Sequence, residues 1–294
     1  MWFVYVVLAS FWASVYYFGN QIAKVTPNVF MIYRGAIPVL FLLPFLPWVT
    51  YIPVWQFYAL CVLQGVIIAF ADYRNFKAMR TWGAEAVSAL HPLGIGAVFI
   101  LWILIKPKIL LGYMDDLWHF GGIILALCGI IYSVVSFKKS SQSKQILQYL
   151  QPFFIAVAFI DVINKQCMSY VDTDLLPYAS YFYIMITGAV VAIINLFLYM
   201  KNSSKIKTLF DLSNLKYSLI IVLLIFYMIS KNYAIFAVSN PSFVTATLYL
   251  YIIWIMIAGQ VMRMYGKNEG YITINRGKAF ILLACTVLLV LLDN

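Results

Sequence analysis

The chain has 294 residues, of which 64% are hydrophobic and only 10% carry a charge. A water-soluble protein of this length needs far more polar side chains on its surface, so the composition excludes a soluble fold. The apolar runs are continuous and do not alternate with polar residues, which argues against a membrane barrel. The sequence therefore predicts an all-α, polytopic membrane protein.

Ten apolar segments follow one another along the chain. A helix needs about 20 such residues to cross the hydrocarbon core. We expect ten membrane-spanning helices, near 2–22, 29–47, 55–76, 83–105, 118–137, 150–169, 176–200, 215–237, 243–262 and 278–292. The first segment has no basic region before it and no small-residue cleavage site, so we expect it to be retained rather than removed as a signal peptide.

Basic residues collect on one side of this arrangement. Of the loops on the side that holds both termini, the only basic residues are Lys106 and Lys108. The opposite side carries Lys24, Lys77, Arg80, Lys138, Lys139, Lys144, Lys201, Lys205, Lys207, Lys216, Lys267, Arg276 and Lys278. The positive-inside rule predicts that the basic side faces the cytoplasm and that both termini lie on the outer side of the cytoplasmic (inner) membrane. Topology thus accounts for the net charge of +10, and no nucleic acid partner is expected.

Two stretches of the chain share a pattern at a distance of 157 positions. Arg74-Asn75-Phe76 is followed by Val87-Ser88-Ala89, and Lys231-Asn232-Tyr233 is followed at the same spacing by Val244-Thr245-Ala246. Each pairing keeps the character of the residue: cation, amide, aromatic, then branched, hydroxyl-bearing and small. A match of this kind between two apolar regions is typical of an internal duplication in a membrane protein.

The polar linker at 138–149 divides the ten segments into five and five. We therefore expect a first repeat at 1–137 and a second at 150–294. Because each repeat has an odd number of helices, the two repeats would insert with opposite orientation, as an inverted-topology pair. A weaker match joins Asn20-Gln21 with Lys165-Gln166, late in the first segment of each repeat.

Polar residues inside the apolar segments are candidates for a functional site, because ionisable groups are costly in a membrane. His91 lies near mid-depth in the fourth segment, and Asp161 near the middle of the sixth. Each could instead make a structural bond to a neighbouring helix. Asn164 and Lys165 follow within one turn of Asp161, and the i, i+4 spacing lets Asp161 and Lys165 pair with each other.

A second group of polar residues lies in the second, third and eighth segments. Asp72, Arg74 and Asn75 cluster late in the third segment, where Asp72 is able to neutralise a nearby cation. Arg34, early in the second segment, is able to snorkel to the headgroups instead. Lys231 lies within the eighth segment, beside Asn232.

Aromatic residues are abundant, with 22 Tyr, 22 Phe and 8 Trp. Many belong to the interfacial belts of a membrane protein. Tyr16 and Tyr249 are placed deeper, where a tyrosine either packs against helices and lipid or faces a cavity and stacks on a cationic or aromatic ligand.

Several enzyme chemistries have no support in the sequence. The chain contains no phosphate-binding G-x-x-x-x-G-K-[ST] loop, no H-E-x-x-H and no G-x-S-x-G. None of its four cysteines has the spacing of a metal site. We therefore expect no catalytic residues, no metal and no cofactor.

The architecture resembles the drug/metabolite transporter superfamily in its EamA branch. Phe11-Trp12-Ala13-Ser14 is similar to an F-W-G-S run of that family, with Ala in place of Gly. Asp161-Val162-Ile163-Asn164-Lys165 is similar to a D-x-I-N-K run of the S-adenosylmethionine uptake carriers of intracellular bacteria within that branch. The resemblance implies a secondary transporter in which helices one to four and six to nine enclose a central cavity, with helices five and ten outside it.

Three functions are consistent with these observations. The first is a carrier for an amino acid or an amino-acid derivative, and the second is a carrier for S-adenosylmethionine or a related nucleoside-bearing cation. The third is a membrane-embedded enzyme that modifies lipids, which would need clustered catalytic groups where the sequence has scattered ones. The bilayer surrounds the protein in each case, and Gly121-Gly122 would permit close packing in a homodimer.

The residues expected to bind the substrate come from both repeats. They are Tyr16, Asn20, Arg74, Asn75, His91, Asp161, Asn164, Lys165, Lys231 and Tyr249.

Overall fold

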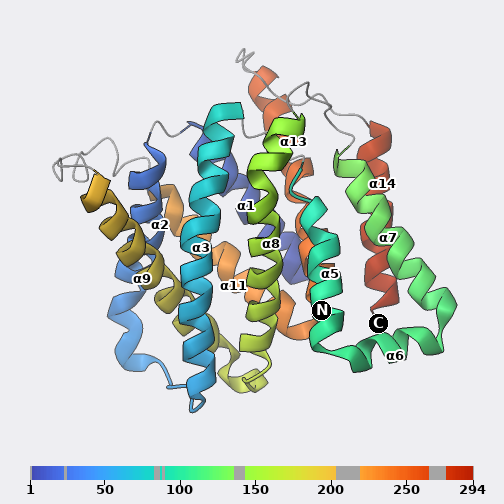
Figure 1. Ribbon diagram of the computed structural model, residues 1–294, viewed down its shortest axis with the longest axis horizontal. Helices are drawn as coiled ribbons and strands as arrows, with labels where there is room; N and C mark the ends of the chain where they lie inside the picture. The colour runs from blue at the N-terminus through green and yellow to red at the C-terminus, as the bar shows by residue number, and fades with distance from the viewer. Residues whose placement is uncertain are drawn as a thin grey trace.

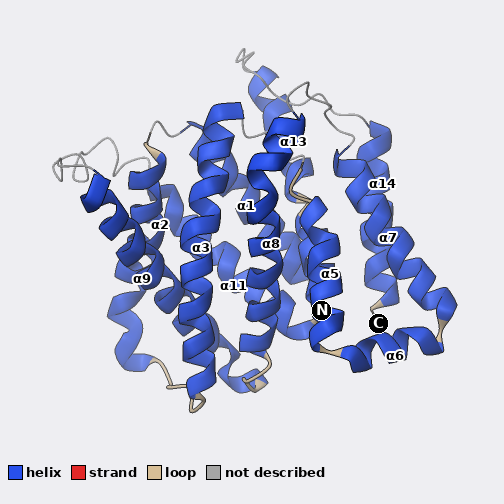
Figure 2. Ribbon diagram, viewed as in Figure 1, coloured by secondary structure: helices blue, strands red, loops and turns tan. Residues whose placement is uncertain are grey.

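The computed structural model describes residues 2–22, 25–82, 87, 90–135, 143–202, 219–264 and 276–293. Nearly all of these residues are helical, and no strand occurs among them (Figure 2). Several of the helices are long and apolar. The prediction of an all-α membrane protein is confirmed to this extent.

The helices follow closely the order of the predicted segments. Their bounds are α1 (Trp2–Ile22), α2 (Pro27–Leu42), η1 (Leu43–Trp48), α3 (Trp55–Trp82), α5 (Leu93–Ile105), α6 (Pro107–Asp115), α7 (Leu117–Val135), α8 (Ser143–Met168), η2 (Thr173–Leu175), α9 (Leu176–Asn202), η4 (Leu219–Ile221), α11 (Val222–Ala237), α12 (Pro241–Leu248), α13 (Tyr251–Met264) and α14 (Arg276–Leu292). Two helices are longer than expected: α3 continues to Trp82 rather than 76, and α8 begins at Ser143 rather than 150.

Two of the predicted segments contain a break. In the fourth, a turn at 90–92 that includes Pro92 precedes α5. Proline has no backbone N–H to continue a helix, which accounts for the interruption there. In the ninth, a turn at 249–250 separates α12 from α13.

Length and composition single out four stretches of the described chain that are able to cross a membrane on their own. These are Pro27–Trp48, Trp55–Trp82, Gln145–Met168 and Thr173–Lys201. The pair α5 and α6 would add a fifth if counted as one span, but the two helices are bent by 101°. Shorter apolar helices, of 10–17 residues, make up most of the remainder.

Most of the helices stand side by side in Figure 1, while α6 runs across the lower edge between α5 and α7. The start of α1 and the end of α14 both lie towards that lower edge. The most extensive helix contacts are α2 with α9, α1 with α11, α3 with α8, α7 with α14 and α3 with α9. The cavity described below lies among the helices other than α7 and α14.

The helices α2 and α9 cross through two glycines. A Cβ atom on Gly35 would lie 2.4 Å from the backbone nitrogen of Ala192 and 2.4 Å from the carbonyl oxygen of Gly188. Real side-chain atoms do not approach backbone so closely, so the crossing requires Gly35. Small residues are the usual means by which membrane helices bring their backbones together.

One glycine of the Gly121-Gly122 pair packs against another helix of the same chain. A Cβ atom on Gly122 would lie 3.0 Å from a methyl carbon of Leu292 on α14, whereas nothing lies within 4 Å of the same position on Gly121. Gly122 is therefore used in the contact between α7 and α14.

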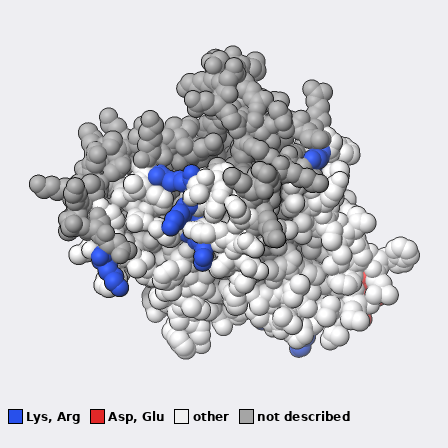
Figure 3. Space-filling model, turned by 45° about the horizontal axis from the view of Figure 1, so that its top comes forward, with Lys and Arg blue, Asp and Glu red and all other residues white. Residues whose placement is uncertain are grey.

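Described basic side chains lie at the edge opposite the termini, where α3 ends with Arg80 and α9 with Lys201 in its last turn. Figure 3 brings this edge forward and shows several Lys and Arg side chains on it. Lys106 and Lys108 flank the bend into α6 at the other edge. Which edge faces the cytoplasm stays a prediction.

Candidate functional site

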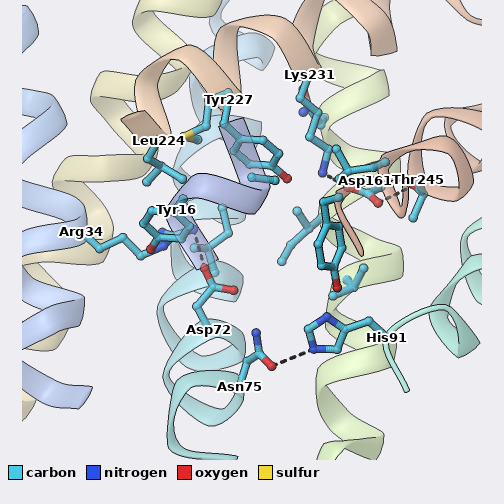
Figure 4. Close-up of a pocket in the computed structure, with 18 of the residues that line it drawn as sticks. Tyr16, Arg34, Asp72, Asn75, His91, Asp161, Leu224, Tyr227, Lys231 and Thr245 are labelled. Carbon is cyan, nitrogen blue, oxygen red and sulfur yellow. Dashed lines mark hydrogen bonds and ion pairs between the residues drawn. The ribbon is translucent and has the colours of Figure 1, made fainter. Parts of the chain in front are cut away.

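A cavity lies between helices from both ends of the chain. Its walls come from α1, α2, α3, α8, α9, α11 and α12, from the first residue of α13, and from the two turns that interrupt the fourth and ninth predicted segments (Figure 4). The empty space, counted out to its open side, is about 1020 Å³.

Asp161 of α8 forms the centre of one wall. Its Oδ1 lies 2.6 Å from the Lys231 Nζ of α11, and its Oδ2 accepts a hydrogen bond of 2.7 Å from the Thr245 hydroxyl of α12. The carboxylate is almost fully buried, at 1% exposure. A buried charge is strongly destabilising unless it is paired, and here both oxygens have partners. Asp161 thus joins three helices at one point.

A second ion pair lies on the other side of the cavity, between Arg34 of α2 and Asp72 of α3. The two side chains are 11% and 19% exposed. Tyr16 of α1 lies next to them in Figure 4. Arg34 therefore turns inward to a carboxylate, and the alternative that it snorkels to the headgroups does not hold.

His91 lies in the turn before α5 and faces α3. Its Nε2 is 2.9 Å from the Asn75 Oδ1. Because the amide oxygen only accepts, the imidazole donates in this bond. The ring also lies 5.0 Å from that of Phe153 on α8. His91 therefore both holds α3 and lines the cavity.

Two asparagines on α8 and α11 face each other. The Asn164 Nδ2 donates to the Asn232 Oδ1 at 3.0 Å. The other half of each amide, the Asn164 Oδ1 and the Asn232 Nδ2, has no hydrogen-bond partner among the described residues. Both side chains are buried and line the cavity. The pair therefore leaves one acceptor and one donor unused among the described residues.

Tyrosines make up much of the remaining wall. Those that line the cavity are Tyr16, Tyr183, Tyr227, Tyr249 and Tyr251. The Lys231 Nζ lies 6.0 Å from the centre of the Tyr227 ring, within the range of a cation–π contact. The site thus combines compensated charges with aromatic faces.

Most of the residues predicted to bind the substrate come together in this cavity. The lining includes Tyr16, Asn75, His91, Asp161, Asn164, Lys231 and Tyr249. The side chain of Asn20 lies outside the described residues. Arg74 does not line the cavity: it is exposed, and its guanidinium carbon lies 5.0 Å from the centre of the Tyr149 ring.

Lys165 does not line the cavity either. Its ammonium donates to three backbone carbonyls at the end of α11, those of Ile235, Phe236 and Val238. The suggested i, i+4 pair with Asp161 does not form, because Asp161 takes Lys231 as its partner.

Sequence reasoning left Tyr227 and Thr245 out of the site. Tyr227 stands one helical turn before Lys231, on the same face of α11, and that spacing would have found it. Thr245 belongs to the repeated pattern and could have been chosen on that ground. The contact of Thr245 with Asp161 depends on how α12 packs on α8, which the sequence does not give.

The described residues contain no group of three or more His, Cys, Asp or Glu that could hold a metal ion. A comparison with protein-family models and one with curated proteins each found no match for this chain.

Proposed function

We propose that this chain is a secondary active transporter that moves a small polar metabolite, an amino acid or an amino-acid derivative, across the cytoplasmic membrane by alternating access. The observation that carries the proposal is the cavity itself. It is enclosed by helices from both halves of the sequence. Its lining includes two ion pairs, several tyrosines, and two asparagines whose amides each keep one polar atom without a hydrogen bond among the described residues. Membrane-embedded ionisable groups that face a cavity are typical of substrate and ion pathways.

The helix contacts support the ten-helix inverted repeat that the proposal assumes. If 1–137 and 150–294 are the two repeats, α1 corresponds to α8, α2 to α9, α3 to α11 and α7 to α14. A two-fold relation then exchanges the contact of α1 with α11 for that of α8 with α3, both of which are extensive. It maps α2 with α9, and α7 with α14, each onto itself. Four of the five most extensive contacts obey this one symmetry. The fifth, α3 with α9, does not, because its counterpart, α2 with α11, is slight.

The two interrupted segments support the same assignment. The turn at 90–92 and the turn at 249–250 fall in the fourth segment of each proposed repeat, and each contributes a cavity residue, His91 and Tyr249. Broken helices at corresponding positions of two repeats are where transporters of this architecture bind their substrate.

The chemistry of the cavity favours a dipolar substrate. Asp161 and Asp72 are able to receive an ammonium, while Lys231 and Arg34 are able to receive a carboxylate. The unused atoms of Asn164 and Asn232 add one donor and one acceptor. A zwitterion therefore finds both signs of charge without requiring a net charge in the membrane.

A second candidate substrate is S-adenosylmethionine or a related nucleoside-bearing cation. The five lining tyrosines favour it, because a purine stacks on aromatic rings and a sulfonium is attracted to their faces. The two candidate functions are distinguished by which ligand raises the Tm of the protein: an amino acid or S-adenosylmethionine.

The proposal is tested first by thermal unfolding of the detergent-purified protein with amino acids, S-adenosylmethionine, nucleosides, sugars and quaternary amines. A ligand that binds the folded state raises Tm with its concentration. The ligand that does so is then used, radiolabelled, in counterflow with proteoliposomes.

Lys231→Met and Arg74→Met form a matched pair of variants, because the two cations correspond in the proposed repeat but only Lys231 lines the cavity. Counterflow should be lost in Lys231→Met and kept in Arg74→Met. Absence of any ligand shift and of any flux, together with turnover of labelled lipid by the same vesicles, would replace the transporter with the lipid-modifying enzyme.

A further inference from the structure

The end of α11 presents a cluster of backbone carbonyls to a single cation. The Lys165 Nζ of α8 lies 2.9 Å from the Ile235 oxygen, 3.0 Å from that of Phe236 and 2.5 Å from that of Val238. An ammonium has three N–H donors, and here each finds a carbonyl. We call these three oxygens the carbonyl cluster.

These carbonyls are available because the helix ends there. The last four C=O groups of an α-helix have no partner within it, and they carry the negative end of the helix dipole. The helix α11 ends at Ala237, so Ile235 and Phe236 belong to its last turn and Val238 follows it. The cluster therefore attracts a cation whatever its source.

Lys165 is not held as a member of an ion pair. The two ion pairs of the described membrane-embedded chain join Arg34 with Asp72 and Lys231 with Asp161. The ammonium of Lys165 is instead bonded to neutral dipoles, and the Asp293 carboxylate, which accepts a hydrogen bond from Ser239, acts on it from further away. Carbonyl oxygens replace the water around an alkali-metal ion in the same way. In transporters with broken helices, helix C-terminal ends and unwound carbonyls coordinate the coupling cation.

We propose that the carbonyl cluster is a monovalent-cation site that the chain occupies with its own Lys165. The tethered ammonium takes the place of a free sodium, potassium or ammonium ion. Removal of the side chain should expose a site of that class in a protein that otherwise has no need of the ion.

The site also connects two sets of helices. Trp102 of α5 donates through its Nε1 to the next carbonyl, that of Ser239, at 3.2 Å. Donors from α5 and α8 thus hold the whole stretch 235–239, which leads into α12 and to Thr245, the partner of Asp161. Occupancy of the cluster by a cation therefore fixes the segment that positions one of the cavity groups.

The consequence for transport rests on the proposed function. If the chain is a carrier, its flux should not depend on which alkali cation is present, because Lys165 fills the site in every salt. The existence of the site does not rest on that function, and its test needs no substrate.

The test compares Lys165→Ala, which leaves the cluster open, with Lys165→Met, which fills the space with an apolar chain of similar length. Tm is measured in chloride salts of sodium, potassium and ammonium against choline, which is too large to enter, at equal ionic strength. The wild type should unfold at one temperature in all four salts. In choline, both variants should have a lower Tm than the wild type.

A small cation should then raise the Tm of Lys165→Ala in a saturable way, by about 2–4 °C, which is the size expected for one modest interaction in a chain of this length. The same cation should leave the Tm of Lys165→Met unchanged. An equal response of the two variants in every salt would overturn the site and leave Lys165 as a helix-capping residue.

Instability of Lys165→Ala does not remove the test. If that variant cannot be purified in choline, it is purified in ammonium chloride beside Lys165→Met. Folded Lys165→Ala recovered in ammonium but not in choline supports the site. Failure in both salts, or recovery that matches Lys165→Met, contradicts it. Because neither readout uses a substrate, this result is independent of whether counterflow is observed.

Discussion

Asp161 and Lys231 lie 70 positions apart in the chain and meet in an ion pair of 2.6 Å, although Lys165 stands only one turn away from Asp161 on the same helix. The pairing across helices leaves Lys165 to the end of α11. The two lysines thus hold α8 to α11 at two levels, one by a carboxylate and one by carbonyl oxygens.

Asp161→Asn should destabilise the protein strongly, because Lys231 then stays buried without its counter-charge. Loss of one partner from a buried pair costs about 3–5 kcal/mol. Thermal unfolding in detergent measures the effect. The double variant Asp161→Asn/Lys231→Met should regain most of the lost Tm, since no uncompensated charge remains, while counterflow stays absent. A double variant no more stable than Asp161→Asn alone would contradict this account.

Gly35→Ala should destabilise the crossing of α2 and α9. The added methyl would lie 2.4 Å from backbone atoms that cannot rotate away, and overpacking of this kind costs about 1–3 kcal/mol. Gly96→Ala is the matched control on α5, because nothing lies within 4 Å of its Cβ position. Its Tm should stay the same or rise slightly, since Ala favours a helix over Gly. Equal losses in both variants would mean that the crossing is not tight.

The Asn164–Asn232 pair should matter more for ligand binding than for folding. In the double variant Asn164→Leu/Asn232→Leu both partners become apolar, so little stability is lost. The ligand that raises Tm should bind about tenfold or more weakly, because it loses hydrogen bonds worth about 1–3 kcal/mol. Ligand titrations of the two proteins give the ratio. Unchanged affinity would place the ligand elsewhere in the cavity.

Trp254 of α13 donates to the Ser10 hydroxyl of α1 at 3.0 Å and so joins these two helices, which are far apart in the sequence. Trp254→Phe and Ser10→Ala should each lower stability by about 0.5–1.5 kcal/mol. In the double variant the losses should be less than additive, as expected for two residues in contact. Unfolding temperatures of the four proteins complete the cycle, and strict additivity would show that the bond contributes nothing.

The helices could be predicted well from the sequence, since continuous apolar runs are a strong signal in a membrane protein. The start of α1, α3 and α9 agrees with the predicted segments. Asp161, His91 and Asn75 could also be predicted as cavity residues, because a polar residue in an apolar segment is recognisable from the sequence whichever way its side chain points.

The direction of each side chain could not be predicted in the same way. Lipid is as apolar as a helix interface, so apolar residues cover every face of a helix and their spacing does not reveal the inner one. Arg74 and Asn75 are neighbours in sequence, yet Arg74 is exposed beside Tyr149 while Asn75 bonds to His91 in the cavity. The partners of Arg34, Lys165 and Lys231 depend on the same rotations.

The glycine crossing has a consequence for how α2 and α9 are able to move. Gly35 of α2 and Gly188 of α9 face each other across the contact that the proposed two-fold relation maps onto itself. Because backbone meets backbone at this point, no side chain is available there to change rotamer and absorb a displacement of one helix along the other. The two helices should therefore shift together, as one rigid pair, in any rearrangement of the chain.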